Sequence, residues 1–556
     1  MAAGSIGPAA THDRFQLSPR PHGLTASRHR MQTFEWIIGL LLGASLLAGL
    51  ARRLGAPYPT FLAIGGALLA FVPHSPSWTL DPHLALTLFV APILVDAAYD
   101  TSLRDLRDNW RPVTGLVIAA VGTTTLAVAL AARWLLPDMP WAVAIALGAI
   151  VAPPDAAAAT AVVRQVRLPH RLLKILEGES LLNDASALLI YRLAIMAVVA
   201  GNLSWASFAP VLLLTVFGSI AAGIVCALAY QRLTRGVQEV PIALILQFAT
   251  TFGVWIAAET VGLSGILTLV AYAMTIARSG GAHMPARMRV PIFAVWEAVV
   301  FVLNAFAFVL IGMQLRPIWE RLAAAGLQRP YAIAALTVLV VTIAARFAWV
   351  MSYNKIIRMR IERDGFHPPR PMAPPTRGGA ILISWAGMRG IVTLAAAFAI
   401  PEALPDGAPF PYRDLILFCA FAVVFGTLVI QGLTLKPLIR WLGLTDDDPV
   451  GHEIRVARSH AYRAALDAIR DDESLHAKLL RKEYGVAVEA NEGDGQAAST
   501  DEQSGGPVRR RAIAAARERT IELRRDEVIG DDAFRVLIAE LDWAELNAGA
   551  AAPNRA

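Results

Sequence analysis

Long apolar stretches recur along most of this chain, and they limit its fold more than any other feature. A helix that crosses a bilayer needs about 20 predominantly apolar residues, and the alternating strands of a membrane barrel would not give such long apolar runs. The sequence therefore predicts an all-α polytopic membrane protein with thirteen transmembrane helices, several of them short or interrupted by Gly and Pro. The expected segments are 35–50, 58–73, 82–99, 112–132, 139–163, 172–200, 204–230, 239–259, 263–277, 291–315, 330–353, 378–400 and 414–436.

The composition agrees with this interpretation. Of the 556 residues, 56% are hydrophobic and 17% are charged, whereas a soluble domain has about 45–50% and about 25%. The mean hydropathy is +0.50. These values exclude an ordinary soluble enzyme, a disordered chain and a nucleic-acid-binding protein, despite a net charge of +6. Both cysteines, Cys226 and Cys419, lie in apolar runs, so no disulfide framework or cysteine metal site is expected.

The distribution of Lys and Arg predicts how the chain is oriented in the membrane. The loops that follow the odd-numbered segments carry 20 such residues and the other loops carry 5. Because cytoplasmic loops are enriched in positive charge, we expect the N-terminus outside and the C-terminus in the cytoplasm of a cell with the protein in its inner (plasma) membrane. The four arginines within residues 1–30 disagree with this topology, and that stretch lacks the apolar core of a signal peptide. Translation starting at Met31 would remove the conflict.

Three regions are expected from the change in composition along the chain. Residues 1–34 form an N-terminal tail, and residues 35–440 form the transmembrane domain. Residues 445–556 form a cytoplasmic tail in which 452–486 and 508–545 have the pattern of charged amphipathic helices. The polar stretch near 488–507 has the composition of a flexible linker. The pattern is typical of a solvated helical appendage, with regulation or dimer stabilisation as an alternative role.

Ionisable side chains inside the expected membrane segments are the first indication of function, since they usually mark an ion pathway or a proton relay. A fully ionised set would carry a net charge of −4, which cations or protons must neutralise. The chain also lacks the GxxxxGK[ST] loop of an ATP-driven motor. We therefore expect a secondary cation transporter, not an enzyme, without a cofactor. The residues are Asp96, Asp155, Glu177, Glu179, Asp184, Glu259 and Glu297, against Arg192, Arg346 and Arg389.

The densest polar group lies in the sixth segment. Ser180, Asn183 and Asp184 are at positions i, i+3 and i+4, so they share one helical face. Their hydroxyl, amide and carboxylate oxygens suit a hard cation. The alternative is a set of polar contacts between packed helices. Arg346 in the eleventh segment needs a buried acid, and Glu179 is the best candidate. That pair would be structural and would leave Asp184 free to titrate.

Two membrane segments contain features that interrupt a helix. Pro153 and Pro154 break the fifth segment immediately before Asp155, which is expected either to coordinate the cation or to cap a helix N-terminus. In the twelfth segment, glycines flank Met388 and Arg389 and permit an unwound stretch. Interrupted helices in separate halves of a chain are typical of inverted-repeat carriers. The alternative for the twelfth segment is a packed helix whose arginine reaches toward water.

These residues resemble a known family. The run from 151 to 195, which contains GESLLND, is similar to the paired fifth and sixth helices of the monovalent cation/proton antiporters, the group that includes the sodium/hydrogen exchangers. Weaker matches are Ala91–Asp96, Glu259–Ile266, Arg346 and Gly387–Gly390. One departure is Pro154, which stands where family members often have Thr or Val before the aspartate. Another is Ala91, where a proline is common.

The resemblance implies a homodimer of thirteen-helix subunits in which a core domain moves like an elevator. It assigns Na⁺ and proton binding to Asp184, with Asn183, Ser180 and Asp155 around it, and it pairs Glu179 with Arg346. Asp96 would line the cytoplasmic approach, with Arg389 and Glu259 supporting the core or the pathway.

The expected activity is exchange of Na⁺, or Li⁺, for H⁺ in pH and sodium homeostasis. It should be electroneutral and one for one, because Asn183 is neutral and only Asp184 obviously changes charge. A K⁺/H⁺ antiporter on the same fold is the nearest alternative. An intramembrane aspartyl protease that uses Asp155 and Asp184 is a distant one, since the neighbouring Asn183 and Glu179 have no part in that chemistry.

Overall fold

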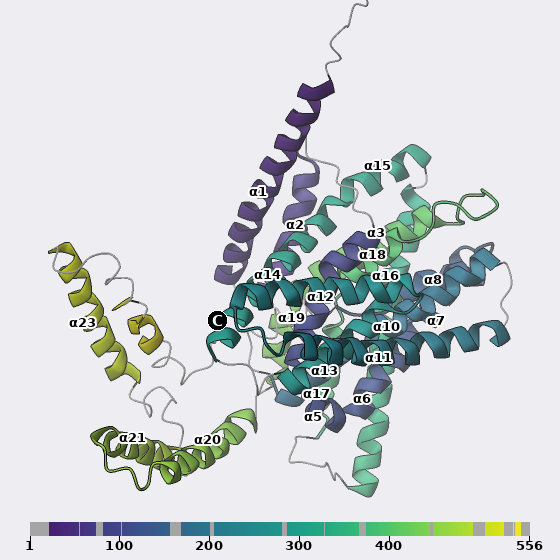
Figure 1. Ribbon diagram of the computed structural model, residues 1–556. Coiled ribbons are helices and arrows are strands. Elements are labelled where there is room, and N and C mark those ends of the chain that lie inside the picture. Colours follow the sequence, from purple (N-terminus) through teal and green to yellow (C-terminus); the bar gives the residue numbers. More distant parts are fainter. Residues whose placement is uncertain are drawn as a thin grey trace, which may run out of the picture. The chain divides into compact units, whose positions relative to one another are not determined.

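The computed structural model describes residues 22–54, 56–73, 82–101, 103–155, 168–200, 205–280, 286–326, 328–365, 374–444, 449–492, 506–526, 537–538 and 540–545. The regular elements in these ranges are all helices (Figure 1). The β-structure found there is one isolated bridge between Ala403 and Pro409. The chain divides into two compact units. The first comprises Met1–Val166 and Arg171–Leu444, and the second comprises Arg167–His170 and Thr445–Ala556.

The helices of the first unit follow in order. The first group is α1 (His22–Leu54), α2 (Tyr58–Ala70), α3 (Pro82–Ala85), the π-helix η1 (Leu86–Val90), α4 (Ala91–Asp100), α5 (Leu103–Asp108), α6 (Trp110–Thr114), the π-helix η2 (Gly115–Ala120), α7 (Val121–Leu135) and α8 (Trp141–Val151). The second group is α10 (His170–Ala200), α11 (Trp205–Thr234), α12 (Val240–Thr260), α13 (Gly265–Gly280), α14 (Ala286–Met313), α15 (Leu315–Ala325), α16 (Gln328–Asp364), α17 (Arg377–Trp385), α18 (Ile391–Phe398) and α19 (Arg413–Leu442).

Eight helices among the described residues are long and apolar enough to cross a membrane, judged by length and composition. Four shorter apolar helices accompany them, at Tyr58–Ala70, His83–Tyr99, Trp141–Val151 and Gly265–Arg278. The prediction of an all-α chain rich in membrane-length helices is confirmed, while the number of thirteen crossings stays a prediction. The eight are Glu35–Leu54, Trp110–Leu135, His170–Ala200, Leu212–Thr234, Val240–Thr260, Met288–Ala323, Arg329–Asp364 and Arg413–Leu442.

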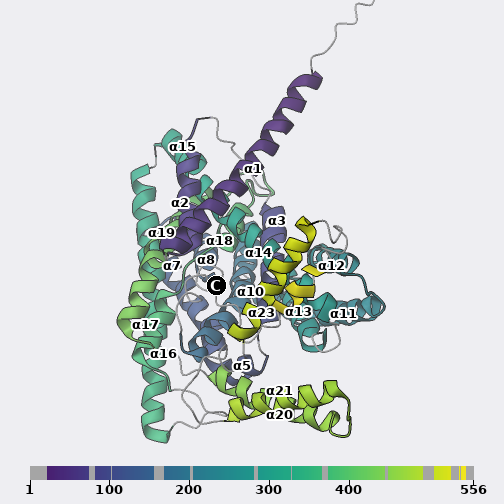
Figure 2. The ribbon, with the colours of Figure 1, turned by 90° about the vertical axis from the view of Figure 1, so that its left-hand side faces the viewer.

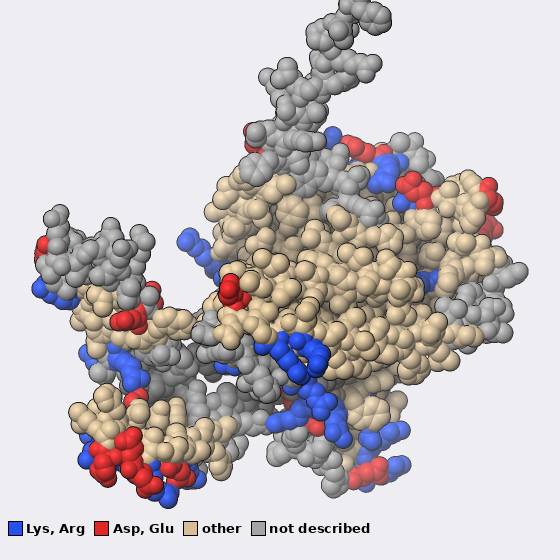
Figure 3. All heavy atoms as spheres, in the orientation of Figure 1, with Lys and Arg blue, Asp and Glu red and all other residues tan. Residues whose placement is uncertain are grey.

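The surface over α11 to α14 has the character of a lipid-facing belt. In Figure 3 a broad area there is almost free of charged side chains, and blue and red atoms gather toward its margins. Large apolar side chains of these helices are exposed, among them Leu214 and Phe217 on α11 and Ile245 on α12. Such a large exposed apolar surface is not compatible with water and fits a hydrocarbon surrounding.

Helix α1 begins earlier than expected. The sequence suggested a tail up to residue 34 and a first membrane segment from residue 35, whereas the helix starts at His22. No proline separates residues 22–34 from the apolar run, so nothing in the sequence stops the helix from extending toward the N-terminus.

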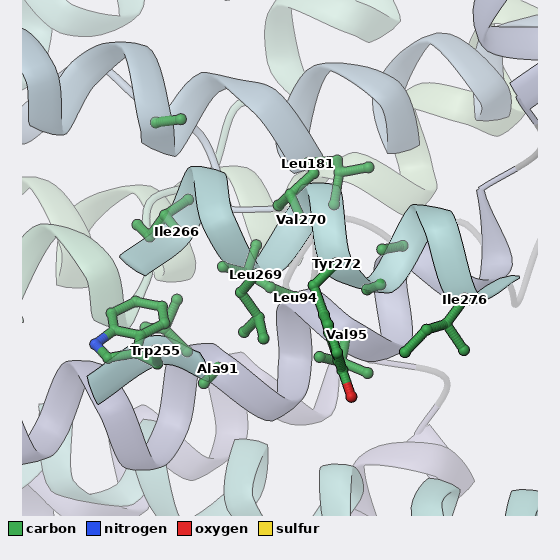
Figure 4. Packing of buried hydrophobic residues seen from close by; sticks show 14 of the residues in the cluster. Ala91, Leu94, Val95, Leu181, Trp255, Ile266, Leu269, Val270, Tyr272 and Ile276 are labelled. Atoms are coloured by element: carbon green, nitrogen blue, oxygen red, sulfur yellow. The ribbon is translucent and has the colours of Figure 1, made fainter. Parts of the chain in front are cut away.

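A buried apolar cluster lies where α4, α10, α12, α13 and α14 meet. Leu181 of α10 packs there with Leu94 and Val95 of α4 and with Leu269 of α13 (Figure 4). Figure 2 shows α16 beside α19, which pack together at another side of the same unit. The position of Leu181 matters for function, because it anchors the middle of α10, the helix with the densest polar motif.

The second unit contains α20 (Pro449–Ala468), α21 (Leu475–Glu492) and α23 (Gly506–Arg525). The sequence suggested one helix over 452–486, but α20 and α21 form a hairpin whose turn lies at residues 469–474. Ser474 starts α21 as its N-cap, since its hydroxyl accepts a 3.2 Å hydrogen bond from the N–H of Ala477. Asp472 accepts a 2.8 Å bond from the N–H of Ser474. Most of the expected linker, residues 493–505, lies outside the described residues.

Candidate ion-binding site

One face of α10 carries the three oxygen-bearing side chains singled out by the sequence. Asn183 is fully buried, Asp184 is 8% exposed, and Ser180 is half-buried one turn earlier. Helical spacing of three and four residues brings these side chains onto one stripe. Several neighbouring residues of α10, such as Leu181 and Ala185, are apolar and buried, so the stripe lies among mainly apolar side chains.

The fifth membrane segment is interrupted beside this face. Helix α8 ends at Val151, and Ala152 and Pro153 form a bend before Pro154 and Asp155. Residues 156–167 lie outside the described residues, so the expectation that Asp155 caps a following helix is not addressed by the structure. The interruption itself has the cause expected from sequence: two consecutive prolines lack N–H groups and cannot continue the helical ladder.

Asn183 connects α10 to this interruption. Its side-chain Nδ2 donates a 2.9 Å hydrogen bond to the carbonyl oxygen of Pro154. Its Oδ1 is buried and receives no hydrogen bond from the described residues. Asp155 and Asp184 lie close enough for their charges to interact. The site therefore combines two interacting carboxylates with a buried amide oxygen that accepts no hydrogen bond from the described residues, which is unusual in a folded interior unless a ligand or water completes it.

The twelfth segment is also interrupted, and the two interruptions contact each other. Helix α17 ends at Trp385 and α18 begins at Ile391. The carbonyl oxygen of Met388, in the extended stretch between them, accepts a 2.6 Å hydrogen bond from the N–H of Asp155. A Cβ atom added at Gly390 would clash with the carboxylate of Asp155. Glycine at position 390 is what allows the Asp155 side chain to lie against this backbone.

Arg389 is fully buried and closes the C-terminal end of α8. Its Nε donates a 3.0 Å bond to the carbonyl of Val151, and its Nη2 donates a 3.2 Å bond to the carbonyl of Ala152. A third bond, from Nη1, goes to the carbonyl of Gly387. The last carbonyls of a helix lack partners and carry partial negative charge, so a guanidinium stabilises them. The alternative of an arginine that reaches toward water is wrong, because no part of this side chain is exposed.

Glu179 and Arg346 form a buried ion pair on the neighbouring face. Two parallel hydrogen bonds of 2.5 and 2.8 Å join the guanidinium to the carboxylate. Arg346 also donates to the carbonyl of Ile383 on α17, at 3.2 Å from Nε and 3.0 Å from Nη2. This bidentate geometry satisfies both charges away from water. The pair ties α10 and α16 to the interrupted helix α17.

The remaining expected residues lie elsewhere. Asp96 is half-buried on α4, the helix whose apolar side chains contact Leu181. Glu259, at the end of α12, forms an ion pair with Arg192 near the C-terminal end of α10 and does not join the group around Asp184. The roles of Asp96 and Glu259 in the ion pathway or in supporting the core therefore stay predictions.

The sequence did not predict two of the contacts described above. The hydroxyl of Thr427 on α19 accepts a 3.0 Å hydrogen bond from the N–H of Arg389 and so holds the extended stretch. Arg192 was counted as a buried charge, but its partner Glu259 was not identified. A threonine in an apolar helix is a weak signal on its own. The pairing of Arg192 was open to a charge-matching argument like the one used for Arg346.

Comparison with known proteins places this site in context. The model of the transmembrane sodium/hydrogen exchanger family matches residues 40–441. The chain is 31% identical over 533 residues to a Na⁺/H⁺ exchanger of Mycobacterium tuberculosis, covering 92% of this chain and 96% of that protein. It is 30% identical over 546 residues to the Na⁺/H⁺ exchanger YjcE of Escherichia coli, covering 93% and 98%.

Two further matches add the fold and a range of ions. The sodium, potassium, lithium and rubidium/H⁺ antiporter of Bacillus subtilis is 31% identical over 425 residues, which is 75% of this chain and 62% of that protein. The solved sodium proton antiporter MjNhaP1 of Methanocaldococcus jannaschii superposes with a TM-score of 0.58 at 17% identity, covering 74% of this chain and 99% of that one. The superposition on MjNhaP1 shows that the two proteins share an all-helical membrane fold. This multi-pass membrane protein therefore belongs to the sodium/hydrogen exchanger family of cofactor-free monovalent cation/proton antiporters.

Proposed function

We propose that this protein exchanges Na⁺, and also Li⁺, for H⁺ one for one, with Asp184 as the group that binds either ion. The observation that carries the proposal is the charge count around the two interrupted helices. Three carboxylates, Asp155, Glu179 and Asp184, lie with the guanidinium groups of Arg346 and Arg389. The net charge of these five groups is −1 when all are ionised, so one monovalent cation or one proton makes the group neutral.

The two ions would compete for the same carboxylate. Burial penalises an uncompensated charge, and Glu179 is already neutralised by Arg346. A cation at Asp184 removes the penalty by coordination, and a proton removes it by covalent bonding. The cation ligands would be the carboxylates of Asp184 and Asp155, Oδ1 of Asn183 and the hydroxyl of Ser180, all of them hard oxygen donors.

Exchange further requires that the site opens to one side of the membrane at a time. The hydrogen bond from Asp155 to the carbonyl of Met388 and the bonds from Arg389 to the end of α8 join the two interrupted helices. We propose that they move together with α10 as one body, in a homodimer whose subunits cross the inner membrane thirteen times with the C-terminal tail in the cytoplasm. The physiological role would be pH and sodium homeostasis.

A K⁺/H⁺ antiporter on the same site is the second candidate. Oxygen ligands alone do not select an ion by size, and the name of the Bacillus subtilis relative includes potassium and rubidium. The two candidates differ in one measurable property, the order of activity among the alkali cations.

The test is dequenching of a pH-sensitive dye in proteoliposomes that carry an imposed proton gradient. Na⁺, Li⁺, K⁺ and choline are added in separate experiments to the parent protein and to Asp184→Asn. The proposal expects dequenching with Na⁺ and Li⁺ that is absent in the variant and with choline. Activity with K⁺ exceeding that with Na⁺ would favour the second candidate. Equal proton flux in parent and variant would contradict the role of Asp184.

A further inference from the structure

A cavity of about 80 Å³ lies toward the C-terminal end of α10, away from the hydrogen-bonded group around Asp184. Residues from α3, α10, α11, α12, α13 and α18 line it, including His83, Leu188, Arg192, Trp255, Glu259 and Ala396. Arg192 follows Asp184 by eight residues, which is about 12 Å along a helix. Leu188 lies between the two at i+4, so Asp184, Leu188 and Arg192 follow one side of α10. The cavity therefore lies on the line from the ion-binding site to this end of the helix.

An ion pair in the wall of the cavity joins two helices. Nη2 of Arg192 on α10 lies 2.7 Å from each carboxylate oxygen of Glu259 on α12. Nη1 of Arg192 adds a 3.4 Å bond to the carbonyl of Leu263. The two side chains are 39% and 30% exposed, so the pair is only partly buried and separating it costs less than separating a fully buried pair.

The acidic half of the pair is held in place by its own hairpin. Oε1 of Glu259 accepts a 2.9 Å hydrogen bond from the N–H of Gly265, the first residue of α13. The intervening turn includes Gly262 at φ = +78°, a conformation that glycine adopts without strain. Among the described residues, the hydrogen-bond partners of the Arg192 guanidinium are Glu259 and the carbonyl of Leu263, both in this α12–α13 hairpin. Arg192 of α10 therefore binds to acceptor groups that the α12–α13 hairpin already holds in position.

Apolar side chains share the wall of the cavity with the ion pair. Leu188, Trp255 and Ile266 line the cavity, and Trp255 and Ile266 also belong to the buried cluster that contains Leu181 (Figure 4). A hydrated cation cannot pass such a layer without losing its water to groups that offer no oxygen ligands. Access to Asp184 from this end therefore requires α10 to move relative to α12 and α13, and that movement would separate Arg192 from Glu259.

We propose that Arg192 and Glu259 form a gate at this end of the ion route. The proposal rests on the proposed function, since only alternating access requires such a gate. When the ion pair is formed, it holds α10 against the α12–α13 hairpin. When α10 moves, the guanidinium leaves and the carboxylate of Glu259 becomes the first ligand that a hydrated monovalent cation meets in the cavity. In the topology proposed above, this end faces the outside of the cell.

Thiol labelling of a cavity position tests the gate without requiring transport. Leu188→Cys is introduced into a background with Cys226→Ala and Cys419→Ala, and a charged, membrane-impermeant methanethiosulfonate reagent is added to right-side-out and to inverted vesicles. Arg192→Gln should speed labelling from one side by up to about fivefold, because a partly exposed ion pair contributes only modestly to the stability of the closed state. Glu259→Gln should do the same. The charge-exchanged variant Arg192→Glu with Glu259→Arg should return the rate toward that of the parent.

A matched control is Arg316→Gln, which removes an exposed ion pair to Glu320 within the single helix α15. It should leave the labelling rate unchanged. Equal rates in the parent and in both gate variants, with sodium-dependent proton flux intact, would overturn the gate alone. Absence of that flux in the parent protein would overturn the proposed function instead, so the two failures are distinguishable.

Discussion

The side-chain amide of Asn183 donates a 2.9 Å hydrogen bond to the main-chain carbonyl of Pro154. This one contact joins the polar face of α10 to the interruption of the fifth membrane segment. It also orients the amide so that its oxygen, Oδ1, stays without a hydrogen bond from the described residues. Because Asp184 is the next residue, the contact sets where the titratable carboxylate lies relative to Asp155.

Asp184→Asn should abolish cation-dependent proton flux while the protein remains folded. An amide cannot alternate between a proton and a cation, so the neutral state would be permanent. The matched control is Glu177→Gln, which removes a half-buried acid from the same helix that pairs with Lys174 instead. Flux measured by dye dequenching should persist in the control. Substantial flux in Asp184→Asn would show that another group carries the proton.

Asn183→Ala should weaken cation binding more than it slows turnover. The variant loses the amide oxygen proposed as a ligand and leaves the Pro154 carbonyl without its donor. A hydrogen bond of this kind contributes about 0.5–1.5 kcal/mol, so the cation concentration that gives half-maximal flux should rise by about two- to tenfold. The measurement is the dependence of initial flux on Na⁺ concentration. A change confined to the maximal rate would argue for a purely structural role of Asn183.

Removing one partner of the Glu179–Arg346 pair should destabilise the fold. Both side chains are at most 3% exposed, and a buried charge without its partner costs about 3–5 kcal/mol. We therefore expect Glu179→Ala to lower the unfolding temperature in detergent, and the double variant with Arg346→Ala to recover part of the loss. The measurement is a double-mutant cycle, which compares the unfolding temperatures of the parent, both single variants and the double variant. Strictly additive effects would mean that the two residues are not coupled.

Gly390→Ala should impair exchange although alanine is small and apolar. Its Cβ would overlap the carboxylate of Asp155 and push it from the position beside Met388. Gly253→Ala is the control, because the added methyl group on α12 would meet nothing within 4 Å. We expect flux to fall strongly in the first variant and to stay at the parent level in the second. Equal flux in both would mean that the Asp155 carboxylate does not need this position.

The sequence was sufficient for the parts of the fold that depend on local chemistry. Apolar runs marked the helices, Pro153 and Pro154 marked the end of α8, and the spacing of Ser180, Asn183 and Asp184 placed them on one face. Charge matching also suggested Glu179 as the partner of Arg346, and the two side chains are in contact. The hairpin turn between α20 and α21 was missed, although Ser474 is a preferred N-cap residue and was open to recognition.

Contacts to main-chain atoms were beyond sequence reasoning. Arg389 binds the carbonyl of Val151, which is 238 residues away, and every residue type carries such a carbonyl. The pattern of charges could suggest that Arg389 needs a negative partner, but not that the end of a broken helix supplies it. The same holds for the bond from Asp155 to Met388, because it depends on how two interruptions meet in space.

The most direct test of the account is to measure proton movement and charge movement on the same proteoliposomes. A sodium concentration jump is applied to vesicles on a solid-supported membrane while an internal dye reports pH. One carboxylate that carries either Na⁺ or H⁺ predicts a pH change without a sustained net current, and a proton flux that vanishes when the sodium ratio across the membrane equals the proton ratio. A sustained current that grows with the proton flux, or a balance point at another ratio, would contradict one-for-one exchange at Asp184.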